Sequence, residues 1–497
     1  MFGHGMFHLK LNSASGAAII VTSHVVPFGN VQNSDAIAYH TKRKEVANHP
    51  RLGAANMALR GAIFDCDGTL LDSMPMWTEQ CVGLLERYGV HDAQKVFEEH
   101  ESLDMDKKCF WYHENLGIGK SGEALLDELW ESVRAAYRRD VRPYEGAREF
   151  LEELRSCGVP CITLSSTPTS LLREALEDHD LLEYFDDLLF VGDVGRGKEY
   201  SDCYLAACRK LGFAKEDTWV FEDAPFGVRS AVRAGMPTVA ILNDHDGRDE
   251  GFMHKWATLV CKTYVGLSAR DLEALSPRVM DALVVAGSPE PSSSAHVSAI
   301  AKQADFVVAA DGGLDVLQRA NATVNAYCGD KDSGSAEAIA WALQHGVPMD
   351  VYPTAKDCTD LELAILLARD EADNRGAALR LTLTCASGGR ADHALGVYGT
   401  LAANADVCPT LSEDSFECKV LSPLGQDTWS IEGRAGATLS VIPIDANTSV
   451  TEMGMVWNLD HEAMGVLAPR GVSNVVEDDR ALVRCDSGTA AVFLHRG

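Results

Sequence analysis

The sequence contains no apolar run that approaches the roughly 18 residues a membrane-spanning helix needs. The apolar stretch at residues 17–21 is too short, and its flanks lack the basic region and cleavage pattern of a secretory signal. Basic side chains are also scarce: 44 Lys and Arg stand against 73 Asp and Glu, for a formal net charge of -29. Such a surface repels the phosphates of nucleic acid and of anionic lipid, so we expect neither as a partner.

Metal-binding and disulfide patterns are missing too, although cysteine itself is not rare. The 14 cysteines form no CxxC pair and have no His-rich neighbours, which argues against a zinc site and favours free thiols in the cytoplasm. The remaining composition, 46% hydrophobic and 24% charged, is typical of a folded globular protein. Because 497 residues exceed what one hydrophobic core usually organises, we expect two or three domains.

The first half of the chain has the pattern of an α/β fold. Residues 58–270 alternate short apolar strands with helical stretches, which predicts a Rossmann-like parallel sheet. A helical insertion at about 76–143 is expected to cap this sheet, with one apolar helix face formed by Trp77, Cys81, Leu84, Leu85 and Tyr88. Residues 1–57 have little periodicity, and they are either an extension without catalytic residues or precede a true start at Met57.

The second half repeats the α/β pattern and then changes. Residues 281–405 again alternate strands and helices, whereas residues 406–497 contain short strands separated by Gly, Pro and Asp. We therefore predict an α/β catalytic domain followed by a small C-terminal β domain. The boundary between the two halves is expected near residues 268–280.

Strand ends in the first half carry groups suited to phosphoryl transfer. Asp65 and Asp67 follow the first strand, and later strand ends supply Ser165, Lys198 and the pair Glu222 and Asp223. Because the carboxyl ends of parallel strands share one edge of a sheet, we expect these side chains to meet. Two carboxylates can divide the roles of nucleophile and acid–base group, while the other side chains bind phosphate and magnesium.

Competing interpretations of these motifs fail at particular residues. A calcium loop that starts at Asp65 would need a carboxylate at its fifth position and Glu at its twelfth, where the chain has Thr69 and Met76. The Walker A-like residues 192–198 are followed by Glu199 instead of the Ser or Thr that binds magnesium. We therefore expect no ATP site in the first half.

In this order the motifs resemble the haloacid-dehalogenase superfamily of phosphatases. The resemblance implies that Asp65 is the nucleophile that forms an aspartyl-phosphate and that Asp67 is the acid–base group. It also implies phosphate contacts from Ser165 and Lys198, and a Mg²⁺ site formed by Asp65, Asp67, Glu222 and Asp223. Related sugar-phosphate mutases often carry a His near the position of Trp77, so a phosphatase is favoured over a mutase. Five basic cap residues are expected to form a solvated face: Lys107, Lys108, Arg134, Arg138 and Arg139.

Acidic residues dominate the strand ends of the second half. Asp311 follows one strand, Asp330 and Asp332 follow the next, and Asp357 and Asp360 form a third group. Carboxylates gathered at one sheet edge repel one another unless cations bind between them, which predicts Mg²⁺ with a polyphosphate. The third group also has the pattern of a helix start with a capping box. Both interpretations can hold, because a helix N-terminus itself favours phosphate.

A Gly-rich turn at residues 388–393 follows, and then come the motifs at residues 454–459 and 471–474. Together with the acidic groups they resemble thiamine pyrophosphokinase over residues 281–497. The resemblance implies transfer of pyrophosphate from ATP to thiamine, giving thiamine diphosphate and AMP, in a homodimer. It implies a Mg²⁺ and ATP site at Asp311, Asp330, Asp332, Asp357 and Asp360, nearby roles for Arg390, Asp392 and His393, and thiamine contacts from Trp457, Ser473 and Asn474.

Three points stay open at this stage. Trp457 can stack on a cationic ring, but it also suits the core of a β domain. Lys331 lies between Asp330 and Asp332, where it can compete with Mg²⁺ or neutralise phosphate. The second half could use another acceptor, such as a pterin alcohol, and Lys331 suggests the further alternative that it binds thiamine without catalysis.

Overall fold

A computed structural model describes residues 59–100, 103, 105–194, 196–243, 249–330, 334–353 and 355–496. Three subjects of the sequence analysis lie outside the described residues. They are the segment 1–57, Lys331 and Asp332.

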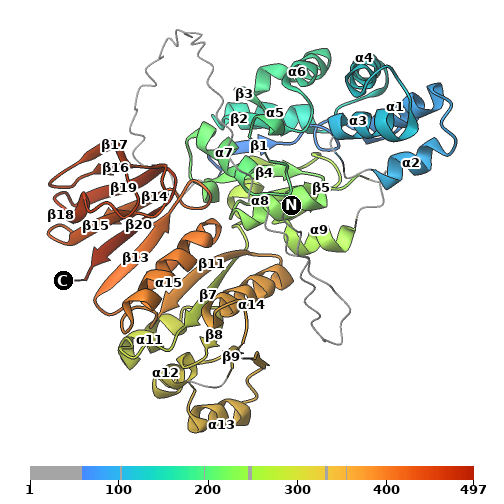
Figure 1. Ribbon diagram of the computed structural model, residues 1–497. Coiled ribbons are helices and arrows are strands. Elements are labelled where there is room, and N and C mark those ends of the chain that lie inside the picture. The colour runs from blue at the N-terminus through green and yellow to red at the C-terminus, as the bar shows by residue number, and fades with distance from the viewer. Residues whose placement is uncertain are drawn as a thin grey trace, which may run out of the picture. The chain divides into compact units, whose positions relative to one another are not determined.

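The first half folds around a six-stranded parallel sheet in the order β3-β2-β1-β4-β5-β6 (Figure 1). The four central strands are buried along their whole lengths, which explains why their sequences are mostly apolar. The strand order reverses between β1 and β4, and open α/β sheets bind ligands at such a switch point. The strands are β1 (Gly61–Phe64), β2 (Cys161–Ser165), β3 (Asp187–Phe190), β4 (Thr218–Glu222), β5 (Thr238–Ile241) and β6 (Leu259–Cys261).

Both faces of this sheet are packed. Along β1, Ala62 and Phe64 belong to one apolar cluster, and Ile63 belongs to another on the opposite face. The helices outside the cap are α5 (Ala147–Ser156), α6 (Thr169–Asp178), α7 (Asp202–Leu211), α8 (Pro225–Arg233), α9 (Glu250–Trp256) and α10 (Ala269–Glu273).

A helical cap follows β1, which confirms that part of the expected fold. Its helices are α1 (Met74–Arg87), α2 (Ala93–Glu99), α3 (Met105–Leu116) and α4 (Gly122–Asp140). Trp77, Cys81, Leu84 and Leu85 are buried as expected, but Tyr88 is 41% exposed, so its assignment to the apolar face was wrong. Helix α1 ends at Arg87, and the Tyr88 hydroxyl donates to Glu128 Oε2 at the surface.

The second half is built on a ten-stranded sheet in the order β10-β9-β8-β7-β11-β12-β13-β20-β15-β18. The pairs from β10 to β12 are parallel, and those from β12 onward are antiparallel. The strands are β7 (Val279–Val285), β8 (Phe306–Ala310), β9 (Ala326–Gly329), β10 (Met349–Val351), β11 (Ala378–Thr384), β12 (Thr410–Ser412), β13 (Phe416–Leu421), β15 (Thr438–Pro443), β18 (Gly471–Val475) and β20 (Ala490–His495).

The C-terminal β-rich region continues this sheet. As predicted, the described chain after about residue 406 consists of short strands. These strands nevertheless belong to the same sheet, because β12 pairs with β11 and β13 pairs with β12. A separate four-stranded sheet, β14-β19-β16-β17, completes the region. It consists of β14 (Thr428–Glu432), β16 (Thr448–Met453), β17 (Leu459–Met464) and β19 (Arg480–Ser487).

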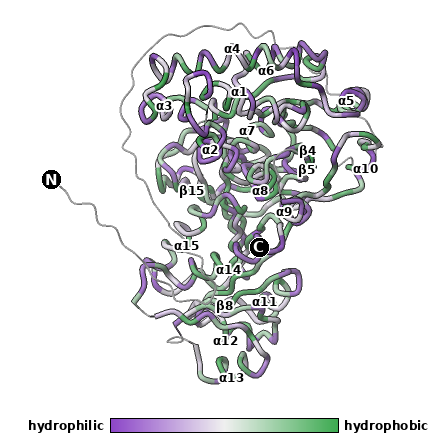
Figure 2. Tube along the Cα trace, turned by 90° about the vertical axis from the view of Figure 1, so that its right-hand side faces the viewer, coloured by the Kyte–Doolittle hydropathy of each residue, from purple (hydrophilic) through white to green (hydrophobic). Residues whose placement is uncertain are grey.

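Helices α11 (Ser294–Ala301), α12 (Gly313–Arg319), α13 (Ala336–Gln344), α14 (Asp360–Arg375) and α15 (Ala391–Ala403) accompany the parallel part of the sheet. The predicted capping box at the start of α14 is present, with Thr359 and Glu362 each accepting the other's backbone N–H. Hydrophobic stretches fall on strands such as β8, and outer helices such as α3 are largely hydrophilic (Figure 2). Within the described part of the chain, no helix has the length and apolar character to cross a membrane.

Candidate active sites

Asp65, Lys198 and Glu222 form a buried ionic group at the β1–β4 switch point. Lys198 Nζ lies 2.5 Å from Asp65 Oδ1 and 2.6 Å from Glu222 Oε1. All three side chains are at least 94% shielded from solvent, being 6%, 5% and 0% exposed, respectively. Burial raises the pKa of Asp65 to about 7, and burial also disfavours the charged form of Lys198. The two carboxylates outweigh burial at Lys198, whose pKa lies above its ordinary value, so the ammonium stays charged.

Asp65, Glu222 and Asp223 have oxygen atoms within 4.8 Å of one another, a grouping that can hold a metal ion. Glu222, however, already accepts from Lys198, from the Tyr204 hydroxyl, and from two backbone N–H groups of the turn into α8. These four hydrogen bonds use the lone-pair positions of a carboxylate. Asp65 and Asp223 are therefore the better-placed ligands, and hard oxygen donors of this kind fit Mg²⁺.

Hydrogen bonds and close packing fix the position of the Asp223 carboxylate. Thr69 Oγ1 lies 3.1 Å from both Asp65 Oδ2 and Asp223 Oδ1, and Asn243 Nδ2 donates to Asp223 Oδ2 at 3.0 Å. Gly68 has φ +84, and a Cβ atom there would lie 2.1 Å from Asp223 Oδ2. Glycine at this position therefore satisfies both a left-handed backbone and a close approach.

Asp67 is not one of the three carboxylates of this grouping, and three hydroxyls hold its side chain. Its Oδ1 accepts from Ser73 at 2.7 Å and from Tyr137 at 2.5 Å, and its Oδ2 accepts from Thr167 at 2.7 Å. Ser165, at the end of β2, is buried, and its Oγ accepts the Thr167 backbone N–H. Asp67 and Ser165 were expected at this sheet edge, whereas the hydroxyls around Asp67 were not, because Ser, Thr and Tyr carry no motif there.

Two of the expected carboxylates in the second half share a lysine that sequence reasoning gave no role. Lys356 Nζ lies 3.1 Å from Asp360 Oδ1 and 3.7 Å from Asp330 Oδ2. Asp311 follows β8 with φ +45, and its Oδ1 accepts from the Tyr327 hydroxyl at 3.3 Å. Asp357, in the third acidic group, has an exposed side chain.

Arg390, Asp392 and His393 lie at the start of α15, where all three are exposed. Arg390 Nη2 contacts Asp392 Oδ2 at 2.5 Å, and this hydrogen bond lowers the pKa of Asp392 to about 2. The turn before them is held by Glu413, which sequence reasoning missed. The Glu413 carboxylate accepts the consecutive backbone N–H groups of residues 385–387 and the hydroxyls of Ser292 and Ser387. The buried Glu413 side chain, bound by three consecutive backbone N–H groups, fixes this turn.

Trp457 is 64% exposed, so the alternative that it is a core residue is wrong. Ser473, also exposed, has φ +61 and donates its backbone N–H to Ser440 Oγ. Asn474 is buried beside them, and its amide is fully used within the protein. Oδ1 accepts from the N–H groups of Trp457 and Val475, while Nδ2 donates to the Trp457 carbonyl and to Glu452 Oε2.

Family models match three segments of the chain. Residues 59–235 match haloacid dehalogenase-like hydrolase, residues 297–409 the thiamin pyrophosphokinase catalytic domain, and residues 429–490 its vitamin B1 binding domain.

Individual proteins resemble each half. The validoxylamine A 7'-phosphate phosphatase of Streptomyces hygroscopicus subsp. limoneus is 32% identical over 189 residues, which are 37% of this chain and 86% of the relative. The phosphorylated carbohydrates phosphatase of Thermotoga maritima is 29% identical over 187 residues, 36% of this chain and 84% of the relative. The solved thiamine pyrophosphokinase of Bacillus subtilis is 20% identical, with a TM-score of 0.37, and covers 43% of this chain and 98% of that one. The chain thus belongs to the haloacid dehalogenase-like hydrolases in its first half and carries both thiamin pyrophosphokinase domains in its second, which joins a phosphoric monoester hydrolase to a thiamine diphosphokinase.

Proposed function

We propose that residues 58–270 hydrolyse a phosphate monoester through an aspartyl-phosphate on Asp65. The observation that supports this is the buried contact of Asp65 with Lys198, beside the carboxylate of Asp223. In the first step an Asp65 oxygen attacks phosphorus, the bond from phosphorus to the ester oxygen breaks, and that oxygen takes a proton from Asp67. In the second step water attacks the same phosphorus, gives a proton to Asp67 and releases inorganic phosphate and the Asp65 carboxylate.

The surrounding residues would bind and hold the reacting groups. Asp65 and Asp223 would hold Mg²⁺, which when bound offsets negative charge on the phosphate oxygens. Lys198 and Ser165 would bind those oxygens, and Glu222 would keep Lys198 in place. Asp67 would serve as the proton donor without ligating the metal through its side chain.

The relatives favour a carbohydrate phosphate as the substrate. By name, one acts on validoxylamine A 7'-phosphate and the other on phosphorylated carbohydrates. Purified protein should release inorganic phosphate from a sugar-phosphate panel in the presence of Mg²⁺. Asp65→Asn should abolish this release while AMP formation by the second half continues. Phosphate release that persists in Asp65→Asn would contradict the proposal.

For residues 281–497 we propose pyrophosphate transfer from ATP to thiamine in the presence of Mg²⁺. The thiamine hydroxyl oxygen would attack the β-phosphorus of ATP, the bond from that phosphorus to the α-bridging oxygen would break, and AMP would leave, with the hydroxyl proton released to solvent. Five carboxylates would serve Mg²⁺ and ATP: Asp311, Asp330, Asp332, Asp357 and Asp360. Arg390, Asp392 and His393 would lie near the phosphates, Trp457 would stack on thiamine, and Ser473 would line its pocket.

The supporting observation is the pair Asp330 and Asp360 around Lys356, a charge arrangement that a metal–phosphate complex can replace. Incubation with thiamine, ATP and Mg²⁺ should yield thiamine diphosphate and AMP in equal amounts, and Asp330→Asn should reduce both at least about 100-fold. Calorimetric binding of thiamine without AMP release would instead favour a binding module. Preference for a pterin alcohol in competition would favour another acceptor.

We further propose that the second half forms a homodimer. Besides the thiamin pyrophosphokinase resemblance, the C-terminal region exposes several large apolar side chains close together in sequence: Met453, Val456, Trp457, Val466, Leu467 and Val472. Light scattering after gel filtration should give twice the monomer mass, and a monomeric mass at micromolar concentration would rule the dimer out.

A further inference from the structure

Helix α4 of the cap is docked on α6 of the sheet domain by two ion pairs. Arg134 Nε lies 2.8 Å from Glu174 Oε2, and Arg138 Nε lies 2.7 Å from Asp178 Oδ2. The two arginines are four residues apart, so they project from one side of α4. Both arginine side chains stay partly exposed, at 39% and 60%, so they are solvated as expected while pairing with α6. Lys108 of the same basic set is only 3% exposed, so its assignment to a solvated face was wrong.

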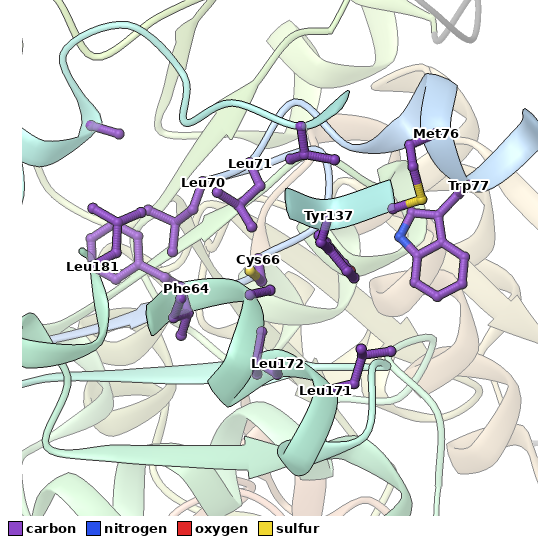
Figure 3. Packing of buried hydrophobic residues seen from close by; sticks show 14 of the residues in the cluster. Phe64, Cys66, Leu70, Leu71, Met76, Trp77, Tyr137, Leu171, Leu172 and Leu181 are labelled. Atoms are coloured by element: carbon purple, nitrogen blue, oxygen red, sulfur yellow. The ribbon is translucent and has the colours of Figure 1, made fainter. Parts of the chain in front are cut away.

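Tyr137 lies on the same side of α4 and reaches the catalytic edge of the sheet. Its hydroxyl donates to Asp67 Oδ1 at 2.5 Å, although 70 positions separate the two residues in sequence. The ring is 1% exposed and packs edge-on against Trp77, with centroids 6.2 Å apart and an interplanar angle of 87°. In Figure 3, Tyr137 lies between Cys66 and Trp77.

The three hydroxyls on Asp67 come from different parts of the fold. Thr167 follows β2 in the sheet domain, and Ser73 precedes the first cap helix. Tyr137 belongs to the body of the cap, and burial raises its pKa well above the ordinary value, so it remains a proton-bearing donor. Its contact with Asp67 therefore depends on how the cap is docked.

We propose that Tyr137 is a positioning residue that orients the Asp67 carboxyl for proton transfer only when α4 is docked on α6, so that cap closure enables leaving-group protonation. The inference rests on the proposed role of Asp67. The Tyr137 proton is not transferred. The proton that reaches the ester oxygen comes from Asp67 and is replaced from the attacking water.

Leaving-group dependence tests this role, because an alkoxide needs a proton to leave whereas 4-nitrophenolate does not. Tyr137→Phe should lower kcat for glycerol 1-phosphate and hexose phosphates about 10- to 100-fold and change that for 4-nitrophenyl phosphate by less than about 3-fold. Tyr112→Phe is the matched control. Tyr112 is a buried cap tyrosine whose hydroxyl has no hydrogen-bond partner among the described residues. It should behave as wild type on both ester classes.

Equal loss on both ester classes, or no loss on either, would overturn the inference. Wild-type protein that hydrolyses neither class would instead refute the proposed phosphatase. Should Tyr137→Phe unfold, the double variant Arg134→Gln, Arg138→Gln decides the question. It should show the same selective loss on alkyl esters, to a smaller extent because exposed ion pairs are weak. Unchanged rates in that variant would overturn the coupling to the cap.

Discussion

Asn474 holds the backbone of Trp457 from two sides, accepting its N–H at 3.2 Å and donating to its carbonyl at 2.8 Å. The same amide also contacts Val475 and Glu452, so it has no donor or acceptor left for a ligand. In the proposed thiamine site, Asn474 would therefore hold the Trp457 backbone in position and would not contact the ligand itself.

Trp457→Ala should raise KM for thiamine about 3- to 30-fold, the effect of losing a cation–π contact. Asn474→Ala should act in the same direction, because the loop that carries Trp457 loses both backbone contacts. The double variant should be little worse than Trp457→Ala alone, since both changes remove one interaction. Steady-state kinetics with varied thiamine measure this, and fully additive losses would mean that Asn474 contacts the substrate independently.

Glu452 beneath Asn474 makes the stability of the C-terminal region depend on pH. Burial raises its pKa from 4.5 to about 7, and Oε1 has no hydrogen-bond partner among the described residues. Between these pH values the folded protein keeps a proton that the unfolded chain has released, so the free energy of unfolding falls as pH rises. Thermal unfolding midpoints of wild type should decline from pH 5 to pH 8, and Glu452→Gln should flatten that decline. Parallel curves for the two proteins would contradict this assignment.

Which side chains meet at the edge of the first sheet was predictable, because their meeting depends only on the strands that they follow. Once Asp65, Ser165, Lys198 and Asp223 follow strands of one parallel sheet, the topology brings them to one edge. The expected metal role of Asp67 came from the family resemblance and not from strand order, and in the structure its carboxylate accepts hydrogen bonds from three hydroxyls.

Contacts between distant segments were not predictable. Tyr137, Glu413 and Glu452 carry no motif, and each acts through a partner that only the folded chain brings near. The continuation of one sheet across residue 406 was likewise not predictable. The spacing of turn residues and apolar residues predicts where strands lie, but it does not predict which strands pair. The pairing of β12 with β11, which extends the sheet, is visible only in the structure.

Gly68 offers a test of how closely Asp223 is packed. Gly68→Ala combines a left-handed φ of +84 with a Cβ atom 2.1 Å from Asp223 Oδ2, so Asp223 must move. The backbone alone costs about 1–2 kcal/mol. Gly89→Ala is the matched control, because Gly89 has φ +75 and open space around its Cβ position. Both variants should lose stability in urea unfolding, Gly68→Ala by more because Asp223 must also shift, and only Gly68→Ala should lose phosphatase activity, at least about 10-fold. Equal activity in the two variants would mean that Asp223 tolerates displacement.

Lys198 should matter to stability as well as to hydrolysis, because it separates two buried carboxylates. Lys198→Met leaves Asp65 and Glu222 without their cation, and breaking a buried pair in this way costs about 3–5 kcal/mol. Adding Glu222→Gln removes one of the unpaired charges, so the double variant should regain part of that stability in urea unfolding. It should not regain phosphatase activity, since the group proposed to bind the phosphate is still missing. If the double variant is less stable than Lys198→Met, Glu222 stabilises the fold mainly through Tyr204 and the backbone of the α8 turn, and not through Lys198.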